Sequence, residues 1–490
     1  MSQTSLRTLL LAGFAAVVLA VPAAAAPKKK AAPPPPLPLE ATAALLRDRA
    51  MAGASPALDF VRDMTTEIGP RPAGSPAEEA AAHWSAARLK ALGFENVQVE
   101  SFPVVQWVRG QERAEIVTAS GLRQPLGAVA LGESPPTPAE GIEAEIVVFD
   151  SLEALQAAPD GSLAGKIAVV NRKMVRMQDG SGYGPISRIR GAGPAEAAKK
   201  GAVAFMLRSA GTDNDRMAHT GTTRFVDGKV PVPAFALSIP DADQLARLAA
   251  KGPVKVSLFS GASYVQSRTF NVIGEIRGRE KPEEVVLIGG HLDSWDLGTG
   301  AVDDASGLAI TMGAAKLIGE LPRRPRRTVR VVFFGAEEVA QPSGSGATGG
   351  TGYVANRKDE MGLHVVAGES DFGADRIYSL NLPKGSVGTD FARMVDRVMA
   401  PIGVLVTAEP ALHGGTDIGP TVAAGSPVFE LNQDGTRYFD LHHTANDTFD
   451  KIDPAQLNQN VAAWAALVWL IADSDIDFRK LAGAAAAPAH

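Results

Sequence analysis

Residues 285–307 have the sequence VVLIGGHLDSWDLGTGAVDDASG, and this stretch decides the fold. It begins with an apolar run as long as a buried strand and ends in an acidic pair that precedes a helical segment. Two further apolar runs, VRVVFFG (329–335) and HVVAG (364–368), continue the alternation of strands with helical segments. Apolar strands separated by helices predict the α/β class, with a mixed, mostly parallel sheet flanked by helices on both faces.

Acidic and imidazole side chains follow each of these strands. In an open α/β sheet, ligands bind at the carboxyl ends of the strands, so we expect side chains at those ends to share one site. A single His-x-Asp or acidic pair has an ordinary explanation as a surface group, but their joint occurrence at strand ends indicates a metal site. The residues concerned are His291, Asp293, Asp303, Asp304, Glu337, Glu338, Glu369, Asp371 and, beyond the PVFEL run (427–431), His442 and His443.

Such a set of residues suits a pair of divalent cations. Two cations close together need oxygen and imidazole ligands, with one carboxylate to bridge them. Several acids must offset the positive charge, and a further carboxylate that binds no metal must take the proton of the attacking water. Because the chain has no cysteine, any metal must be held by His, Asp and Glu.

The composition narrows the classes of function. Of the 490 residues, 45% are hydrophobic and 21% are charged, as in soluble globular proteins, and the length favours two domains. The absence of cysteine excludes disulfide scaffolds, thiolate zinc sites and cysteine nucleophiles. The net charge of −6, without a basic block in the body of the chain, argues against nucleic acid as a partner. The sequence contains no G-x-S-x-G serine elbow and no H-E-x-x-H helix, which removes two common hydrolase types.

Residues 1–39 predict export. Arg7, the apolar run 9–21 and the small residues 23–26 match a cleaved signal peptide over 1–26. An uncleaved membrane anchor is the alternative, and the shortness of the apolar run disfavours it. The Lys- and Pro-rich segment 27–39 predicts an extended linker. We therefore expect a periplasmic or secreted protein with no stable membrane insertion after signal cleavage.

The rest of the chain predicts one α/β domain that is interrupted by an insert. The insert alternates short β-like runs with loops, contains one helical stretch (194–200), and carries no cluster of His and acidic residues. We therefore expect it to form a β-rich lobe without a metal ligand. The end of the chain is Ala-rich after Leu481 and predicts disorder. The α/β domain is expected to consist of residues 40–112 and 267–475. The insert is expected over 113–266 and the tail over 476–490.

Together, the motifs resemble the co-catalytic zinc exopeptidase family, which includes leucine-type aminopeptidases and glutamate carboxypeptidases. The resemblance rests on GGHLDSWDLGTGAVDDASG (289–307), FFGAEE (333–338), ESDFG (369–373) and HHTANDT (442–448), and it is strongest to the carboxypeptidase Q-like branch. The segment IGPRPAGSPAEEAAAHW (68–84) is similar to the N-terminal part of that branch. Two segments of the insert, GKIAVVNRK (165–173) and RGAGPAEAAKKGAVAFMLRSAG (190–211), resemble the protease-associated domain. The likeness spans 41–472.

The resemblance implies two zinc ions and a role for each motif residue. It implies His291 and Asp371 as ligands of one zinc ion, Glu338 and His443 as ligands of the other, and Asp303 as the bridge between them. It further implies that Asp293 holds the His291 ring, that Glu337 is the general base, and that a cis peptide bond precedes Asp304. The implied substrates are dipeptides or short peptides, for which His442 and Asp417 are candidate contacts, and a homodimer is left open.

Two other functions fit the same fold. One is a catalytically inactive receptor or binding protein, since fold does not fix function. The other is a single-zinc transferase similar to glutaminyl cyclases. The complete set of ligand positions and the retained Glu337 favour the two-zinc exopeptidase over both.

Overall fold

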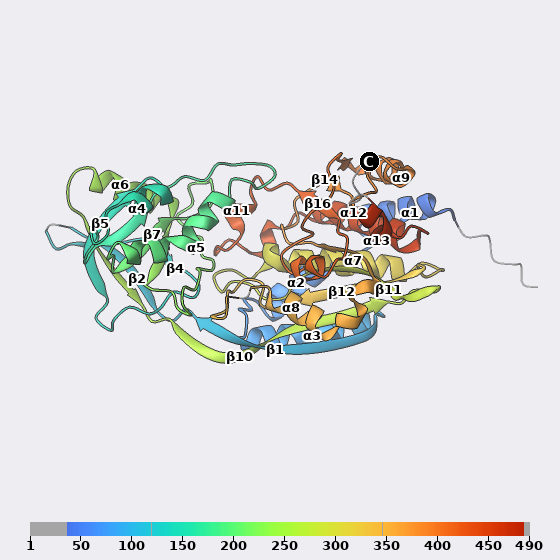
Figure 1. Cartoon of the computed structure of the whole chain (residues 1–490), viewed down its shortest axis with the longest axis horizontal. Coiled ribbons are helices and arrows are strands. Elements are labelled where there is room, and N and C mark those ends of the chain that lie inside the picture. Colours follow the sequence, from blue (N-terminus) through green and yellow to red (C-terminus); the bar gives the residue numbers. More distant parts are fainter. Residues whose placement is uncertain (1–36, 119, 345, 485–490) are drawn as a thin grey trace, which may run out of the picture. The chain divides into compact units, whose positions relative to one another are not determined.

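The two runs VVLIGG and VRVVFFG pair in parallel at the centre of a five-stranded sheet (Figure 1). The computed structural model describes residues 37–118, 120–344 and 346–484, so the expected signal peptide and most of the expected linker lie outside the described residues. Within that part of the chain, no helix has both the length and the apolar character needed to cross a membrane. The sheet order is β1 (Glu95–Val108), β10 (Ser263–Ile276), β12 (Arg327–Phe334), β11 (Lys281–His291) and β13 (His364–Glu369).

Both faces of this sheet are covered, as the apolar strands predicted. Along β11, Val286 and Ile288 pack into a core with helices α7 and α12, whereas Val285 and Leu287 pack on the other side with Tyr353 of helix α8. The mixed α/β class is therefore confirmed. The helices outside the insert are α1 (Leu39–Met51), α2 (Ala57–Glu67), α3 (Pro76–Ala91), α7 (Ser306–Gly319), α8 (Thr348–Asn356), α9 (Asp390–Met399), α10 (Gly419–Ala423), α11 (Tyr438–Leu441), α12 (Pro454–Asp473) and α13 (Phe478–Ala484).

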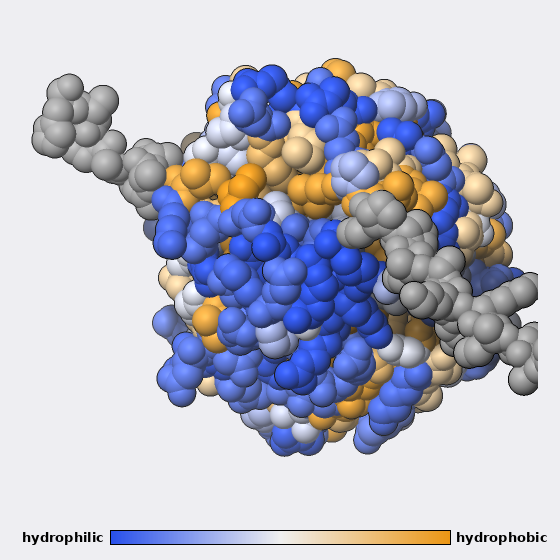
Figure 2. All heavy atoms as spheres, turned by 90° about the vertical axis from the view of Figure 1, so that its right-hand side faces the viewer, coloured by the Kyte–Doolittle hydropathy of each residue, from blue (hydrophilic) through white to orange (hydrophobic). Residues whose placement is uncertain are grey.

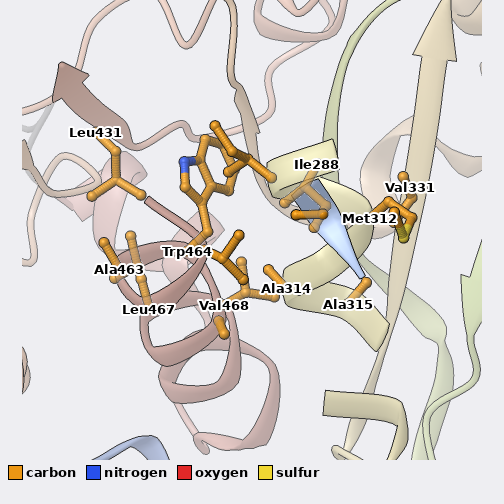
Figure 3. Packing of buried hydrophobic residues seen from close by; sticks show 14 of the residues in the cluster. Ile288, Met312, Ala314, Ala315, Val331, Leu431, Ala463, Trp464, Leu467 and Val468 are labelled. Atoms are coloured by element: carbon orange, nitrogen blue, oxygen red, sulfur yellow. The ribbon is translucent and has the colours of Figure 1, made fainter. Parts of the chain in front are cut away.

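Helix α12 is buried almost all round, and it anchors the largest core. Asp453 caps its first turn by accepting from the backbone N–H groups of Ala455 and Gln456, and Pro454 occupies the first helical position. Figure 3 shows Trp464 and Val468 of α12 beside Ala314 of α7, where the small alanine side chain lets the two helices approach closely. A second, three-stranded sheet lies next in the chain, in the order β15 (Leu405–Val406), β14 (Ile377–Asn381) and β16 (Glu430–Gln433).

Residues of the predicted insert form an eight-stranded sheet of their own. The predicted helical stretch 194–200 is part of a longer helix, because Pro185 and not Pro194 occupies its first turn. Helix α6 was not predicted from the sequence, although Ser238 caps it and Pro240 lies in its first turn. The sheet order is β3 (Arg123–Pro125), β2 (Glu112–Val117), β9 (Lys255–Ser260), β5 (Ile142–Phe149), β6 (Ile167–Val170), β7 (Ala204–Arg208), β8 (Ala234–Leu237) and β4 (Ala128–Ala130), with helices α4 (Leu152–Ala157), α5 (Gly184–Lys199) and α6 (Ile239–Ala249).

The chain enters and leaves the insert along one antiparallel ladder. Strands β1 and β10 pair from Glu95 to Val108, and β2 and β9, which follow and precede them, pair in turn. At this junction Arg109 donates to Asp296 at 2.7 and 2.8 Å, which ties the base of the insert to the loop after β11. Because β10 already begins at Ser263, the expected boundary at 266 falls inside a strand. By its contacts the chain divides only between Leu37 and Pro38, so a separate domain over 113–266 stays a prediction.

The start of the expected tail packs against the body of the chain. Helix α13 begins at Phe478, whose side chain is fully buried and contacts Phe391 with ring centroids 5.1 Å apart. The expected tail from 476 therefore includes a docked helix, because a single large apolar side chain fixes it.

Figure 2 shows that one face of the molecule is mostly hydrophilic, with hydrophobic residues gathered toward its upper part.

Candidate metal centre

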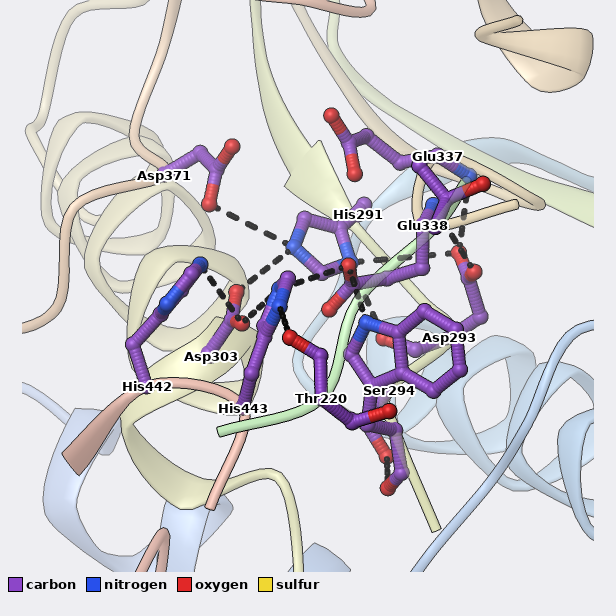
Figure 4. Close-up of polar contacts among 12 residues, drawn as sticks. Thr220, His291, Asp293, Ser294, Asp303, Glu337, Glu338, Asp371, His442 and His443 are labelled. Atoms are coloured by element: carbon purple, nitrogen blue, oxygen red, sulfur yellow. Dashed lines mark hydrogen bonds and ion pairs between the residues drawn. The ribbon is translucent and has the colours of Figure 1, made fainter. Parts of the chain in front are cut away.

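Each expected ligand lies at the end of a structural element, and the five come together in one site (Figure 4). His291 is the last residue of β11, and Asp371 lies two residues beyond β13. Glu338 follows β12, Asp303 belongs to the turn Ala301–Ala305 before α7, and His443 lies two residues beyond α11. The parallel register of β11, β12 and β13 brings their carboxyl ends to the same edge of the sheet.

The ligand atoms form two groups that share Asp303. In the first group, His291 Nε2 lies 3.0 Å from Asp303 Oδ1 and 3.3 Å from Asp371 Oδ1. In the second group, His443 Nε2 lies 2.8 Å from Glu338 Oε2 and 3.3 Å from Asp303 Oδ2. Asp303 thus presents one oxygen to each histidine, which is the arrangement of a bridging carboxylate.

The donor set and its spacing fit zinc. Zinc bonds of about 2.0–2.1 Å in a tetrahedral shell place neighbouring ligand atoms about 3.3 Å apart. The observed separations of 2.8–3.3 Å are close to that value. In addition, Glu338 Oε1 is buried and has no hydrogen-bond partner within the described residues. An oxygen atom left in this state is costly unless a ligand occupies it.

The closely packed, buried carboxylates of the site also indicate bound cations. Burial, and then the charge of Asp371, raise the pKa of the Glu337 carboxyl to about 8. Burial, and then the charge of Asp303, raise the pKa of Glu338 well above its usual value. Burial also lowers the pKa of His443 well below its usual value, which keeps the ring in the neutral form that binds a metal. Carboxylates packed this closely repel one another unless positive charge lies between them.

Asp293 contacts the His291 ring through its backbone. Its carbonyl oxygen accepts from His291 Nδ1 at 2.9 Å. The carboxylate oxygen Oδ1 is 3.8 Å from that nitrogen. It accepts instead from the backbone N–H of Glu337 at 3.1 Å, while Oδ2 accepts from the N–H of Glu338 at 3.3 Å. Asp293 therefore fixes both the tautomer of His291 and the turn that carries the two glutamates.

The loop between His291 and Asp303 rests on a buried arginine. Arg71, which is fully buried, donates to the carbonyl oxygens of Leu292, Thr299 and Gly300 at 2.5–3.0 Å. The peptide bond between Asp303 and Asp304 is cis, as the resemblance implied. Arg71 belongs to the segment 68–84 that resembled the family, although the sequence alone assigned it no role.

Residues of the insert reach the second ligand group, which the sequence did not predict. The backbone N–H of Thr220 donates to the carbonyl of His443 at 3.0 Å, and the Thr220 carbonyl lies 3.4 Å from His443 Nδ1. His219 Nε2 lies 2.8 Å from His442 Nδ1. A lone histidine in a loop carries no spacing pattern, so no signal in the sequence marked His219. The expected absence of ligands from 113–266 is untested, but the insert does touch the site.

A cavity of about 340 Å³ opens on the two ligand groups. Glu337 and His442 line it, as do Arg190 and Tyr183 from the insert. Asp417, expected as a substrate contact, does not line this cavity. Its side chain is fully buried, and burial and then the charge of Glu369 raise its pKa well above the usual value, so the carboxyl group points into the protein interior.

Comparisons with known proteins agree with this geometry. A model of peptidase family M28 matches residues 271–468, which hold all five expected ligands. The chain is 36% identical over 413 residues to carboxypeptidase Q of Bos taurus, covering 83% of this chain and 83% of that protein. It is 35% identical over 414 residues to carboxypeptidase Q of Homo sapiens, again covering 83% of each.

Solved structures show the same fold. A peptidase M28 precursor from Shewanella amazonensis SB2B superposes with a TM-score of 0.84 at 43% identity, over 90% of this chain and 98% of that one. A zinc aminopeptidase from Bacillus subtilis has a TM-score of 0.59 at 21% identity, over 84% of this chain and 93% of that one. The second likeness concerns the fold alone.

Proposed function

This chain belongs to peptidase family M28, and from that premise we propose that it is a two-zinc exopeptidase that hydrolyses dipeptides or short peptides. The observation that carries the proposal is Asp303, whose two oxygens face one histidine each, His291 and His443. Asp371 completes the first zinc site and Glu338 the second. An inactive binding protein on this fold has no need to keep both groups, so the complete set argues against that alternative.

Glu337 is the general base of this proposal. When bound, the zinc ions supply Lewis-acid chemistry that polarises a carbonyl group and acidifies water. Glu337 lines the cavity but belongs to neither ligand group, and its backbone is fixed by Asp293. Its carboxylate takes the proton from the attacking water and then delivers that proton to the nitrogen of the leaving amine. His442, which also lines the cavity, is a candidate substrate contact.

The names of the relatives point to opposite ends of a peptide, a carboxypeptidase and an aminopeptidase. A dipeptide has both ends within reach of one site, and the cavity of about 340 Å³ suits a ligand of that size. The β-rich insert, interpreted as a protease-associated domain, forms one wall of the cavity through Tyr183 and Arg190. The predicted signal peptide supports action in the periplasm or outside the cell.

Metal dependence tests the proposal. We expect the purified protein to carry two zinc ions per chain, measured by plasma mass spectrometry, and to hydrolyse Ala-Ala. A chelator should abolish hydrolysis, and added zinc should restore it. Protein that holds no metal under native conditions and keeps its activity in the chelator would contradict the proposal.

A further inference from the structure

Trp295 is a buried tryptophan that contacts both ligands of the second group. It lies in the loop that follows β11, and its exposed fraction is 7%. Its indole Nε1 donates a hydrogen bond to Glu338 Oε2 at 2.7 Å. The centroid of its ring is 5.7 Å from that of His443, with an angle of 57° between the two planes. One side chain therefore touches the carboxylate and the imidazole that would hold the second zinc ion.

The hydrogen bond from Trp295 fixes the orientation of Glu338. A carboxylate group rotates readily about its last bond, and a donor on one oxygen selects a single orientation. Here Oε2 accepts from the indole, while Oε1 is buried without a hydrogen-bond partner within the described residues. Because an indole N–H can only donate, Trp295 cannot compete with Glu338 for the metal. Its role at the site is therefore to orient a ligand.

The ring of Trp295 also belongs to the hydrophobic core of the insert. It packs in one cluster with Ile116 of β2 and Val256 of β9. It also meets Trp107 edge-on, with ring centroids 6.4 Å apart and an angle of 69° between the planes. A residue of the catalytic loop thus reaches into the insert and ties the core of the insert to the metal centre.

The outer edge of the ring lies against Gly132, which follows β4 of the insert. A Cβ atom added at Gly132 would overlap Cη2 of Trp295, and its next two nearest atoms, at 3.0 and 3.2 Å, belong to the same ring. The backbone of Gly132 is held in place, because its N–H donates to the Gly221 carbonyl at 3.0 Å and its carbonyl accepts from the Thr223 N–H at 3.1 Å. The insert therefore sets how far the ring of Trp295 can extend.

We propose that Trp295 is a positioning residue that couples the insert to the second zinc site through the orientation of Glu338. This inference rests on the proposed function and specifies how one of its two metal sites is controlled. A movement of the insert that displaces the ring also displaces the donor to Glu338, so the zinc affinity of the second site follows the position of the insert. The first site differs, since its ligands His291 and Asp371 follow strands of the central sheet.

The first test removes the indole N–H and keeps an aromatic ring. Zinc affinity is measured on the full chain by stepwise competition with a chelating dye, and Glu338→Gln, which lacks the second site, assigns the two steps. We expect Trp295→Phe to weaken the second site by about 10- to 100-fold and to leave the first unchanged. The matched control is Trp107→Phe, whose lost N–H donates to the carbonyl of Ser134 at 2.9 Å and not to a ligand. It should keep both affinities.

The second test displaces the ring from the side of the insert. Gly132→Ala should weaken the second zinc site by about 10-fold, although Gly132 is not itself a ligand. Trp295 also lines a cavity of about 300 Å³, so its ring has room to shift and the variant should fold. In the Trp295→Phe background the same change should have no further effect, because a phenyl ring does not fill the space above Gly132. The control is Gly184→Ala, an exposed position of the insert where an added Cβ meets no atom within 4 Å.

The outcomes separate this inference from the proposed function. Unchanged zinc affinity in Trp295→Phe would overturn the inference, as would an equal weakening of both sites or the same weakening in Trp107→Phe. Additive effects of Gly132→Ala and Trp295→Phe would show that Gly132 acts by another route, and would overturn the coupling to the insert. Wild-type protein that binds fewer than two zinc ions and does not cleave Ala-Ala would overturn the proposed function itself.

Discussion

The two ligand groups of the metal centre are supported in different ways. His291 ends a central strand that is paired on both sides, and its partner Asp371 follows the neighbouring strand. His443 lies in a loop after the short helix α11, with a positive φ of 58° that is uncommon for a residue other than glycine. Its backbone carbonyl and its ring both contact Thr220 of the insert.

This difference shows how the insert takes part in the site. The register of the central sheet positions His291 and the strand end before Asp371 in the first group. The second group keeps a less common backbone conformation, which persists only where surrounding contacts hold it. Those contacts come in part from Thr220 and His219 of the insert, so the insert supports one half of the metal centre and also forms a wall of the cavity.

Asp303 belongs to both groups, so its loss should have the largest effect. We expect Asp303→Ala to lower the zinc content of both sites and to reduce kcat/KM for Ala-Ala by more than about 10⁴-fold. The bridging carboxylate is then missing, and the general base has no correctly placed metal-bound water to deprotonate. Zinc stoichiometry and kinetics measure this effect. The control is Asp296→Asn in the same loop, whose carboxylate pairs with Arg109 and contacts neither group. An Asp303→Ala protein that still binds two zinc ions tightly would show that the groups are independent.

The adjacent glutamates should separate catalysis from metal binding. Glu337→Gln keeps the size of the side chain but cannot accept a proton, so kcat should fall by about 10²- to 10⁴-fold while the zinc content stays near that of the wild type. Glu338→Gln should release the zinc ion of the second group, since an amide is a weaker ligand than a carboxylate. If Glu337→Gln lost zinc and Glu338→Gln kept it, the two roles would be reversed.

The smallest effect is expected from the insert. His219→Phe keeps a ring but removes the hydrogen bond to His442, whose ring stacks on the ligand His443 at 3.5 Å. The second group should therefore bind zinc about 10- to 100-fold more weakly while the first group is unchanged. A chelator titration should then show two separate steps of zinc release. The control is His83→Phe, an exposed histidine that packs beside Phe270, away from the site. Identical release curves for His219→Phe and the wild type would mean that the two halves do not differ in their need for the insert.

The sequence predicted the candidate ligands at strand ends better than those in loops. His291, Glu338 and Asp371 follow apolar strands, and parallel strands end at one edge, so local patterns sufficed to bring them together. His442 and His443 were both candidates from their place beyond an apolar run, but only the family resemblance selected His443 as the ligand. The contributions of His219 and Arg190 depend on contacts between segments far apart in the chain, which neither periodicity nor spacing encodes.

Local structure accounts for other details that the sequence did not supply. Asp417 was expected as a candidate substrate contact, a role that stays a prediction, and its carboxyl group is buried beside Glu369. The ring of His291 contacts the backbone carbonyl of Asp293, a group that every residue has and that no motif can reveal. The start of α5 was misplaced because the sequence offers two prolines, and a helix tolerated the second in its interior.

The ladder of β1 and β10 has a topological consequence. Val108 and Ser263 face each other across the ladder, so residues 109–262 occupy the place that a hairpin turn takes between two antiparallel neighbours. The insert can therefore become longer, become shorter or be exchanged without any change in the strand order of the five-stranded sheet. The same fold can therefore acquire a different cavity wall, and with it a different substrate range, through replacement of a single loop.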